Sequence, residues 1–241
     1  MEKLAIHGIC KLAKKYQVES ILCRVADHLK ANWPTGLREY VAAQSAFTGD
    51  VDYIASNSHD IWERVEHDYP EPALSIRLAK EVGELSVLSA AFYRLAISDP
   101  SIDWIKTLRV RKAGTLSARW DLLEKEDWVR YNAGKDELFD RSRRFFPNEY
   151  HETLKELGSK CRNEDKCRMV VHDLCAFHDK QVTADFARQP DVIRQMLELR
   201  TEADDLDFCF SCGDALGITI YNYMNKIWDD LPAIFGLTAP H

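Results

Sequence analysis

Four cysteines in the second half of the chain have the type and spacing of metal ligands. Cys209 and Cys212 form a C-x-x-C pair, and Cys161 and Cys167 form a looser C-x5-C pair. A C-x-x-C turn lets both sulfurs bind one Zn²⁺ at about 2.3 Å, and the glycine at 213 favours such a turn. The polar RNED segment after Cys161 supplies the loop that the wider pair requires. The two pairs together predict one Zn²⁺ held by four thiolates.

Four thiolates leave no coordination position open, so this site would be structural rather than catalytic. One pair would come from the loop that enters a helix near residue 164, and the other from the loop that enters the last helix. The metal would tie the two loops together. Its binding would contribute folding free energy on the order of 10 kcal/mol.

Two other interpretations of these cysteines stay open at this point. The four are reduced residues in or near the core, or Cys209 and Cys212 form a redox pair. Thioredoxin-like proteins place C-x-x-C at the start of a helix that follows a strand. No strand pattern precedes Cys209, and the FS between the two cysteines supplies no activating group.

A second group of reactive side chains follows in VHDLCAFHDK, which contains His172, Cys175 and His178. On a helix Cys175 and His178 lie at i and i+3, so they could share a face as a nucleophile pair or supply a replacement zinc ligand. Cys175 also continues the apolar stripe that runs through Cys167 and Leu174. That continuity favours core packing for Cys175.

The elements that must position these residues are helices throughout. Apolar residues recur at three- and four-residue spacing in 4–16, 19–33 and 84–98, which is typical of amphipathic helices. Pro34 ends the second of them, and PEPALSIRLAKEVG starts with prolines and ends at Gly83. No segment alternates as a strand does. The sequence therefore predicts an all-α chain of helical hairpins, followed by a second helical region with the zinc cysteines.

Length and composition limit the function classes. A chain of 241 residues, 46% hydrophobic and 29% charged, fits one large or two small folded domains. Its net charge of −7 supplies no basic field for nucleic acid, and the basic clusters at 108–114 and 141–146 are interpreted as ion-paired faces. Its apolar runs are shorter than the roughly 18 residues of a membrane span. MEKLAIHGICKLAKK lacks a signal-peptide core, so we expect an intracellular protein.

Seven cysteines inside a cell should be reduced, which makes a disulfide framework the weaker interpretation. Cys10 and Cys23 fall on apolar helix faces and are predicted to be small core residues. The sequence contains no Gly-rich phosphate loop, no G-x-S-x-G and no H-E-x-x-H motif. The common enzyme fingerprints are therefore missing.

Several segments also match a known family in order along nearly the whole chain. Residues 12–40 read LAKKYQVESILCRVADHLKANWPTGLREY, a helical pair that leads into an H-L…W-P-T-x-L turn. Residues 76–93 follow an I-x-L-A-x-E…A-A-x-Y pattern, and 208–237 combine FCFSC with IWDDLPAIFGL. In this order and spacing the motifs resemble the region that follows the BTB/POZ fold in basidiomycete BTB proteins.

The resemblance implies two regions. Residues 1–110 would be a BACK-like helical region, in which 1–33 correspond to the last helices of a BTB domain, and 111–241 would be a cysteine-bearing C-terminal region. The BTB fold itself should precede Ala5 and is missing from this chain. BTB dimerisation and cullin docking are therefore not carried over.

These observations predict a non-catalytic adaptor, a module that binds another protein and contains one structural Zn²⁺. Self-association through the N-terminal helices is a further expectation, whereas nucleic acid and membranes are not expected partners. The alternative is a cysteine-dependent enzyme or redox protein. It would use Cys175 with His172 or His178, or the pair Cys209 and Cys212.

Overall fold

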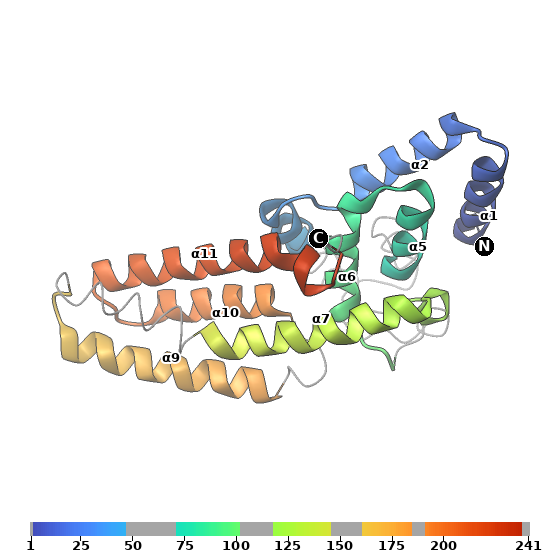
Figure 1. Cartoon of the computed structure of the whole chain (residues 1–241). Coiled ribbons are helices and arrows are strands. Elements are labelled where there is room, and N and C mark those ends of the chain that lie inside the picture. Colours follow the sequence, from blue (N-terminus) through green and yellow to red (C-terminus); the bar gives the residue numbers. More distant parts are fainter. Residues whose placement is uncertain (1, 47–70, 102–117, 146–160, 185–190, 238–241) are drawn as a thin grey trace, which may run out of the picture. The chain divides into compact units, whose positions relative to one another are not determined.

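The computed structural model describes residues 2–46, 71–101, 118–145, 161–184 and 191–237 (Figure 1). Within these ranges the chain is helical, as predicted, and has no strand beyond an isolated bridge at Ala118. It divides into two compact units: unit 1 is residues 1–132 with 231–241, and unit 2 is residues 133–230. The predicted boundary between 110 and 111 lies outside the described residues and stays a prediction.

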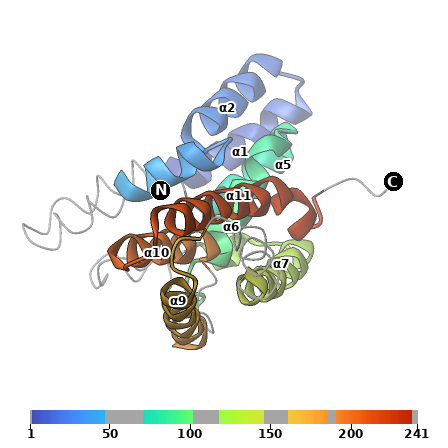
Figure 2. The same ribbon diagram turned by 90° about the vertical axis from the view of Figure 1, so that its left-hand side faces the viewer.

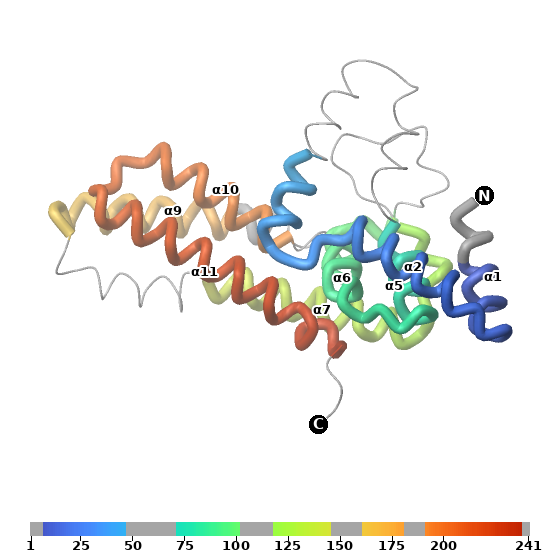
Figure 3. Tube along the Cα trace, turned by 90° about the horizontal axis from the view of Figure 1, so that it is seen from above, coloured from blue at the N-terminus to red at the C-terminus, as the bar shows by residue number. Residues whose placement is uncertain are grey.

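Unit 1 is built on helix α5, which contacts α1, α2 and α6 (Figure 3). Residues 37–46 are also helical. The named elements of this unit are α1 (Glu2–Lys15), α2 (Glu19–Asn32), α5 (Pro72–Val82), η2 (Leu85–Val87), α6 (Leu88–Ala96) and η4 (Trp120–Leu122).

Helix α5 begins and ends where the sequence predicts. Pro72 occupies its first position, and the buried carboxylate of Glu71 accepts the backbone N–H groups of Ala73 at 3.0 Å and Leu74 at 2.6 Å. These are donors that the helix itself leaves without partners. Gly83 closes the helix at φ +75°, a conformation that glycine adopts without a Cβ clash.

The core of unit 1 lies where α5 and α6 meet. Ile76, Phe92 and Leu95 are completely buried there. The ring of Phe92 stacks on Phe235 at a centroid distance of 5.5 Å, so the C-terminal end of the chain completes this core. Edge-to-face packing of Tyr40 on Tyr93 at 5.4 Å extends it.

Two long helices, α7 (Lys125–Arg144) and α11 (Phe210–Ile234), belong to both units, because each unit boundary falls inside one of them. In the described residues 118–145, the short helix η4 is followed by the single long helix α7.

Unit 2 combines the second part of α7 with α9 (Glu164–Ala184), α10 (Val192–Asp205) and most of α11. Helix α9 packs on α10, and Figure 2 shows α9 below α10 and α11. The centroid of the buried Phe145 ring lies 5.0 Å from the ring centroid of Tyr223 of α11 and 6.4 Å from that of His178 of α9. Ser142 donates a 2.7 Å hydrogen bond to Gln195 of α10. The end of α7 is therefore the centre of this unit.

The basic cluster at the end of α7 is ion-paired, as predicted. Arg141 pairs with Glu137 at 2.8 Å and with Asp230 at 2.5 Å, and Arg144 pairs with Asp140 at 3.0 Å. The other basic cluster, at 108–114, lies outside the described residues. None of the helices that the structure describes is long and apolar enough to cross a bilayer.

Candidate metal centre

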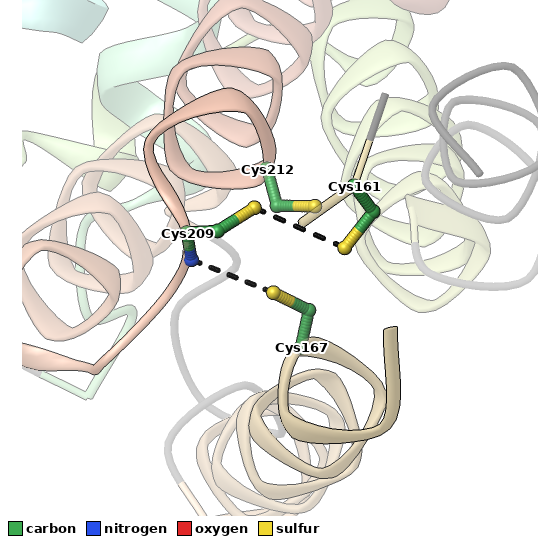
Figure 4. Close-up of side chains that lie close together, drawn as sticks. All are labelled: Cys161, Cys167, Cys209 and Cys212. Atoms are coloured by element: carbon green, nitrogen blue, oxygen red, sulfur yellow. Dashed lines mark hydrogen bonds between the residues drawn. The ribbon is translucent and has the colours of Figure 1, made fainter. Parts of the chain in front are cut away.

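Two helix N-termini in unit 2 bring the four predicted ligands together. Cys161 precedes α9 and Cys167 lies in its first turn, whereas Cys209 directly precedes α11 and Cys212 lies in its first turn. Their sulfur atoms point toward one another (Figure 4) and all lie within 4.8 Å of one another. The prediction that both pairs lie in loops was wrong for Cys167 and Cys212, because each helix begins before its second cysteine.

Asn163 explains why α9 begins where it does. Its side-chain oxygen accepts the N–H of Lys166 at 3.3 Å, and its carbonyl accepts the N–H of Cys167 at 3.0 Å. Asparagine is among the preferred residues at this position, because it satisfies a donor that the first turn leaves free. Glu164 and Asp165 then add negative charge near the positive end of the helix dipole. The turn holds Cys167 in a fixed direction.

Cys209 has the corresponding position at the start of α11. Its carbonyl accepts the N–H groups of Cys212 and Gly213, both at 3.0 Å. Its sulfur accepts backbone N–H groups from Arg162 and Cys212, which lower the pKa of Cys209 to about 6. The C-x-x-C pair therefore caps the helix, with a sulfur where a serine or aspartate oxygen would ordinarily lie.

The sulfur spacing suits a tetrahedral metal ion. The sulfurs of Cys161 and Cys209 are 3.8 Å apart, and the N–H of Cys209 donates to the sulfur of Cys167 at 3.4 Å. In a regular tetrahedron with metal–sulfur bonds of about 2.3 Å, neighbouring sulfurs are about 3.8 Å apart. Small side-chain rotations would place all four sulfurs around one ion.

Burial opposes the charge that these ligands need. Cys167 and Cys212 are buried, whereas Cys161 and Cys209 are partly exposed. Burial is the main reason why the pKa of Cys212 lies well above its ordinary value, and it also raises the pKa of Cys167. A coordinated divalent cation deprotonates its thiols outright and supplies the compensating charge. The four side chains could therefore hold a metal ion.

The donor set narrows the choice of metal. Magnesium and calcium prefer oxygen ligands, whereas four sulfurs in tetrahedral geometry are typical of zinc or iron. Four protein ligands also fill a tetrahedral coordination sphere and leave no position for a substrate. What the arrangement can do chemically is bind a metal tightly and cross-link two segments.

An ion pair that the sequence analysis did not find links the same two segments. Lys166, which precedes Cys167, pairs with Asp207 at 2.7 Å, two residues before Cys209. Both side chains are largely exposed, so the pair alone contributes little stability. Lys166 and Asp207 are 41 residues apart in the chain, so no local sequence pattern could have predicted that they form an ion pair.

The second group of candidate residues lies outside the metal centre. Among the described residues, the side chains that lie close enough together to share a metal ion are those of the four cysteines, and this group does not include His172, Cys175 or His178. His172 is exposed beside Asp173, Cys175 is partly buried, and His178 is buried. Burial and Asp179 raise the pKa of Cys175, which is the opposite of what a nucleophilic thiol requires.

The remaining two cysteines, Cys10 and Cys23, differ in their exposure to solvent. Cys10 is completely buried, which confirms the prediction of a core residue. Cys23 is exposed, so the same prediction was wrong for it. The covered face of α2 centres on Leu29 and includes the partly buried Leu22 and Val25. Cys23 follows Leu22, and successive helix residues point about 100° apart, which turns its side chain away from that face.

Comparisons of the chain with protein-family models, with curated proteins and with solved structures found no match. The resemblance to the region after the BTB/POZ fold therefore stays a prediction from the motifs. The geometry of the cysteines and the exposed surface of unit 2 are therefore what indicates a function.

Proposed function

We propose that this protein is a non-catalytic interaction module whose unit 2 is stabilised by a structural Zn²⁺ bound to Cys161, Cys167, Cys209 and Cys212. The convergence of four sulfurs from two chain segments supports the metal site most directly. Zinc is the metal of choice because it accepts four thiolates in a tetrahedron and has no redox chemistry of its own. The ion would cross-link the segment before α9 to the start of α11.

The first experiment is elemental analysis of the purified full-length chain, combined with thiol counting before and after a strong chelator. About one zinc per chain is expected. Cys23, the exposed thiol, should react with the thiol reagent at once, and the four ligands only after chelation. A metal-free chain in which the four ligands react without chelator would contradict the proposal. One equivalent of iron would keep the site but change the metal.

An exposed apolar stripe on α11 supports the interaction role. Phe210, Ile218 and Tyr221 are all exposed, and Phe210 is 88% exposed although it lies between two ligands. Positions i, i+8 and i+11 of a helix fall within a sector of about 80°. We define these three residues as the α11 stripe. Large apolar side chains that share an exposed face are typical of a protein-binding surface.

The charge around the stripe favours a basic partner. Residues 191–230, which contain α10 and most of α11, carry nine acidic and three basic side chains. Asp214 is exposed on the same side of α11 as Phe210 and Ile218. The occupant that we propose is an amphipathic helix of another protein, with an apolar face toward the stripe and basic residues at its border.

A synthetic helical peptide with leucines on one face and lysines on the other is the probe for this surface. We expect it to bind the zinc-loaded chain, more weakly at high salt, and to lose most of its affinity when Phe210 and Tyr221 are both replaced by serine. The matched control peptide carries glutamates in place of the lysines. Equal binding of both peptides, or no effect of the double substitution, would contradict the proposal. If the chain instead self-associated through the α11 stripe as its concentration rose, the occupant of the stripe would be a second copy of this chain rather than another protein.

We also propose self-association through helix α1. Ile9 and Leu12 lie on one exposed face of α1, and Tyr16 continues it just after the helix ends. Cys10 and Ala13, on the adjoining face of the helix, are buried. Light scattering over a concentration series should show a mass above that of the monomer, and replacement of Leu12 and Tyr16 by serine should abolish it. A monomer at every concentration would contradict this proposal.

A further inference from the structure

The four cysteines of the metal centre differ in their access to solvent. Cys167 and Cys212 are 3% and 2% exposed, whereas Cys161 and Cys209 are both partly exposed. The two accessible residues come from different segments, and their sulfurs are 3.8 Å apart. In Figure 4 they face each other directly across the centre. A small oxidant therefore meets two neighbouring sulfurs that belong to opposite sides of the cross-link.

We propose that Cys161 and Cys209 are an oxidation site, at which a hydroperoxide converts the two ligands into a disulfide and releases the metal ion. This inference rests on the proposed function, because it assigns a regulation to the same zinc centre. It differs from a C-x-x-C redox pair, since the disulfide joins two segments that lie 48 residues apart.

The reaction balances with the hydroperoxide as the two-electron oxidant. One ligand thiolate attacks the peroxide oxygen and the O–O bond breaks, so that a sulfenic acid forms and the hydroxide or alkoxide takes a proton from solvent and leaves as water or alcohol. The second thiolate then attacks the sulfenic sulfur, the S–S bond forms, and the sulfenic hydroxyl takes a second proton from solvent and leaves as water. The two sulfurs together lose two electrons, and the peroxide gains them. The remaining pair, Cys167 and Cys212, is too few to hold a four-coordinate ion.

Geometry favours this disulfide over the one within the C-x-x-C pair. Cys212 is buried in the first turn of α11, where its own N–H bonds the carbonyl of Cys209. A disulfide between Cys209 and Cys212 would leave the segment before α9 without any covalent link to α11. The disulfide between Cys161 and Cys209 instead replaces the metal as the link between them. Oxidation should therefore release the ion without unfolding unit 2.

The test treats the zinc-loaded full-length chain with hydrogen peroxide under anaerobic conditions. Zinc release is followed with a chromogenic chelator, the disulfide is located by peptide mass mapping, and helicity is followed by circular dichroism. We expect release of the bound zinc, a Cys161–Cys209 disulfide, unchanged helicity, and zinc rebinding after reduction. Release with a Cys209–Cys212 disulfide, release with sulfinic acid alone, or no release would overturn the inference. A chain without zinc before the treatment would instead overturn the proposed function.

Two matched variants keep the metal and separate the roles of the ligands. Cys161→His and Cys167→His each convert the centre to Cys₃His, a common structural zinc set. Cys161→His removes the disulfide partner, so peroxide-driven zinc release should slow by about tenfold or more. Cys167→His has the same kind of ligand set but leaves the accessible pair intact, so peroxide should release its zinc clearly faster than the zinc of Cys161→His. Equal rates in the two variants would also overturn the inference.

The variant Cys23→Ser controls for general thiol oxidation. Cys23 is exposed and is not one of the four cysteines of the metal centre, so it can react with peroxide without loss of a ligand. We expect this variant to release zinc as the unmodified chain does. If release required Cys23, the oxidation site would not be the pair that we propose.

Discussion

Helices α5 and α9 differ in how much apolar surface they bury. In α5 seven of eleven residues are buried, and most of them are apolar. In the described side chains of α9, 164–180, the buried ones are Cys167, Leu174 and His178. A fully buried aliphatic side chain contributes about 1.5–3 kcal/mol, so α5 can be held by its core alone. Helix α9 has far less apolar area to bury.

The candidate metal centre lies at the start of this helix. A structural zinc site contributes on the order of 10 kcal/mol to folding, which exceeds what one buried leucine supplies. Cys167 is on α9 itself, and Cys161 precedes it. Unit 2 has an apolar core of its own, in which Ile193, Leu199 and Ile227 are buried, but α9 contributes little to it. A metal cross-link would therefore stabilise α9 more than any other part of the unit.

The largest expected effect compares two buried cysteines, one in each unit. Cys212→Ser removes a ligand and should cost several kcal/mol of unfolding free energy together with most of the bound zinc. Cys10→Ser buries a hydroxyl in unit 1 and should cost about 1–3 kcal/mol with the zinc retained. Thermal unfolding and elemental analysis of both variants measure this. Equal losses of stability, with zinc retained in both, would remove the distinction between the units.

The next effect concerns the core of unit 1. Phe92→Ala removes a completely buried ring that stacks on Phe235, and should destabilise unit 1 by about 3–5 kcal/mol. Hydrogen exchange should rise in α5 and α6. The zinc content should not change, because the centre lies in unit 2. A simultaneous loss of zinc would show that the units unfold together.

A pH effect sharpens the account of α9. Desolvation lowers the pKa of His178 from 6.5 to about 4, and the negative charge of Asp179 acts in the opposite direction. As the pH falls, His178 takes up a proton in the unfolded chain before it does so in the folded chain. The free energy of unfolding is therefore undiminished by His178 above pH 6.5 and decreases as the pH falls towards 4. The loss is on the order of 3 kcal/mol at most. His178→Gln removes it.

The measurement compares denaturant unfolding of both chains near neutral pH and in mild acid. The unmodified chain should lose more stability on acidification than His178→Gln. Acid also releases the metal, but it does so in both chains alike, so this effect cancels when the two losses of unfolding free energy are subtracted. Identical pH dependence would show that His178 is not the group whose protonation weakens unit 2.

The smallest effect on stability belongs to the α11 stripe. Phe210 is almost fully exposed, so Phe210→Ser should change the unfolding free energy by less than about 0.5 kcal/mol. Zinc content should also stay unchanged. Differential scanning fluorimetry with and without zinc tests this, and a large loss of stability would mean that the side chain serves the fold rather than a partner.

The sequence predicted what depends on local chemistry. Prolines and glycines located the ends of α2 and α5, because Pro34 and Gly83 act through backbone geometry alone. The four cysteines were found from their spacing, since C-x-x-C at a helix start carries its own geometry. These features need no knowledge of distant residues.

What the sequence left unpredicted depends on tertiary contacts. The exposure of Cys23 depends on which face of α2 packs on α5. The apolar residues of α2 extend around more than one face of the helix, so the sequence pattern alone does not show which face is covered. The return of Phe235 to the core of unit 1, and the pairing of Lys166 with Asp207, join residues that are far apart in the chain. Periodicity reports only which residues share a face within one helix.

Hydrogen exchange, measured segment by segment on the zinc-loaded chain before and after chelation, tests whether a metal holds α9 in place. We expect chelation to raise exchange in 164–180 and in the first turns of α11, and to leave α5 and α6 protected. Unchanged protection of α9 after the metal has left would contradict the claim that a metal cross-link, rather than an apolar core, holds this helix in place.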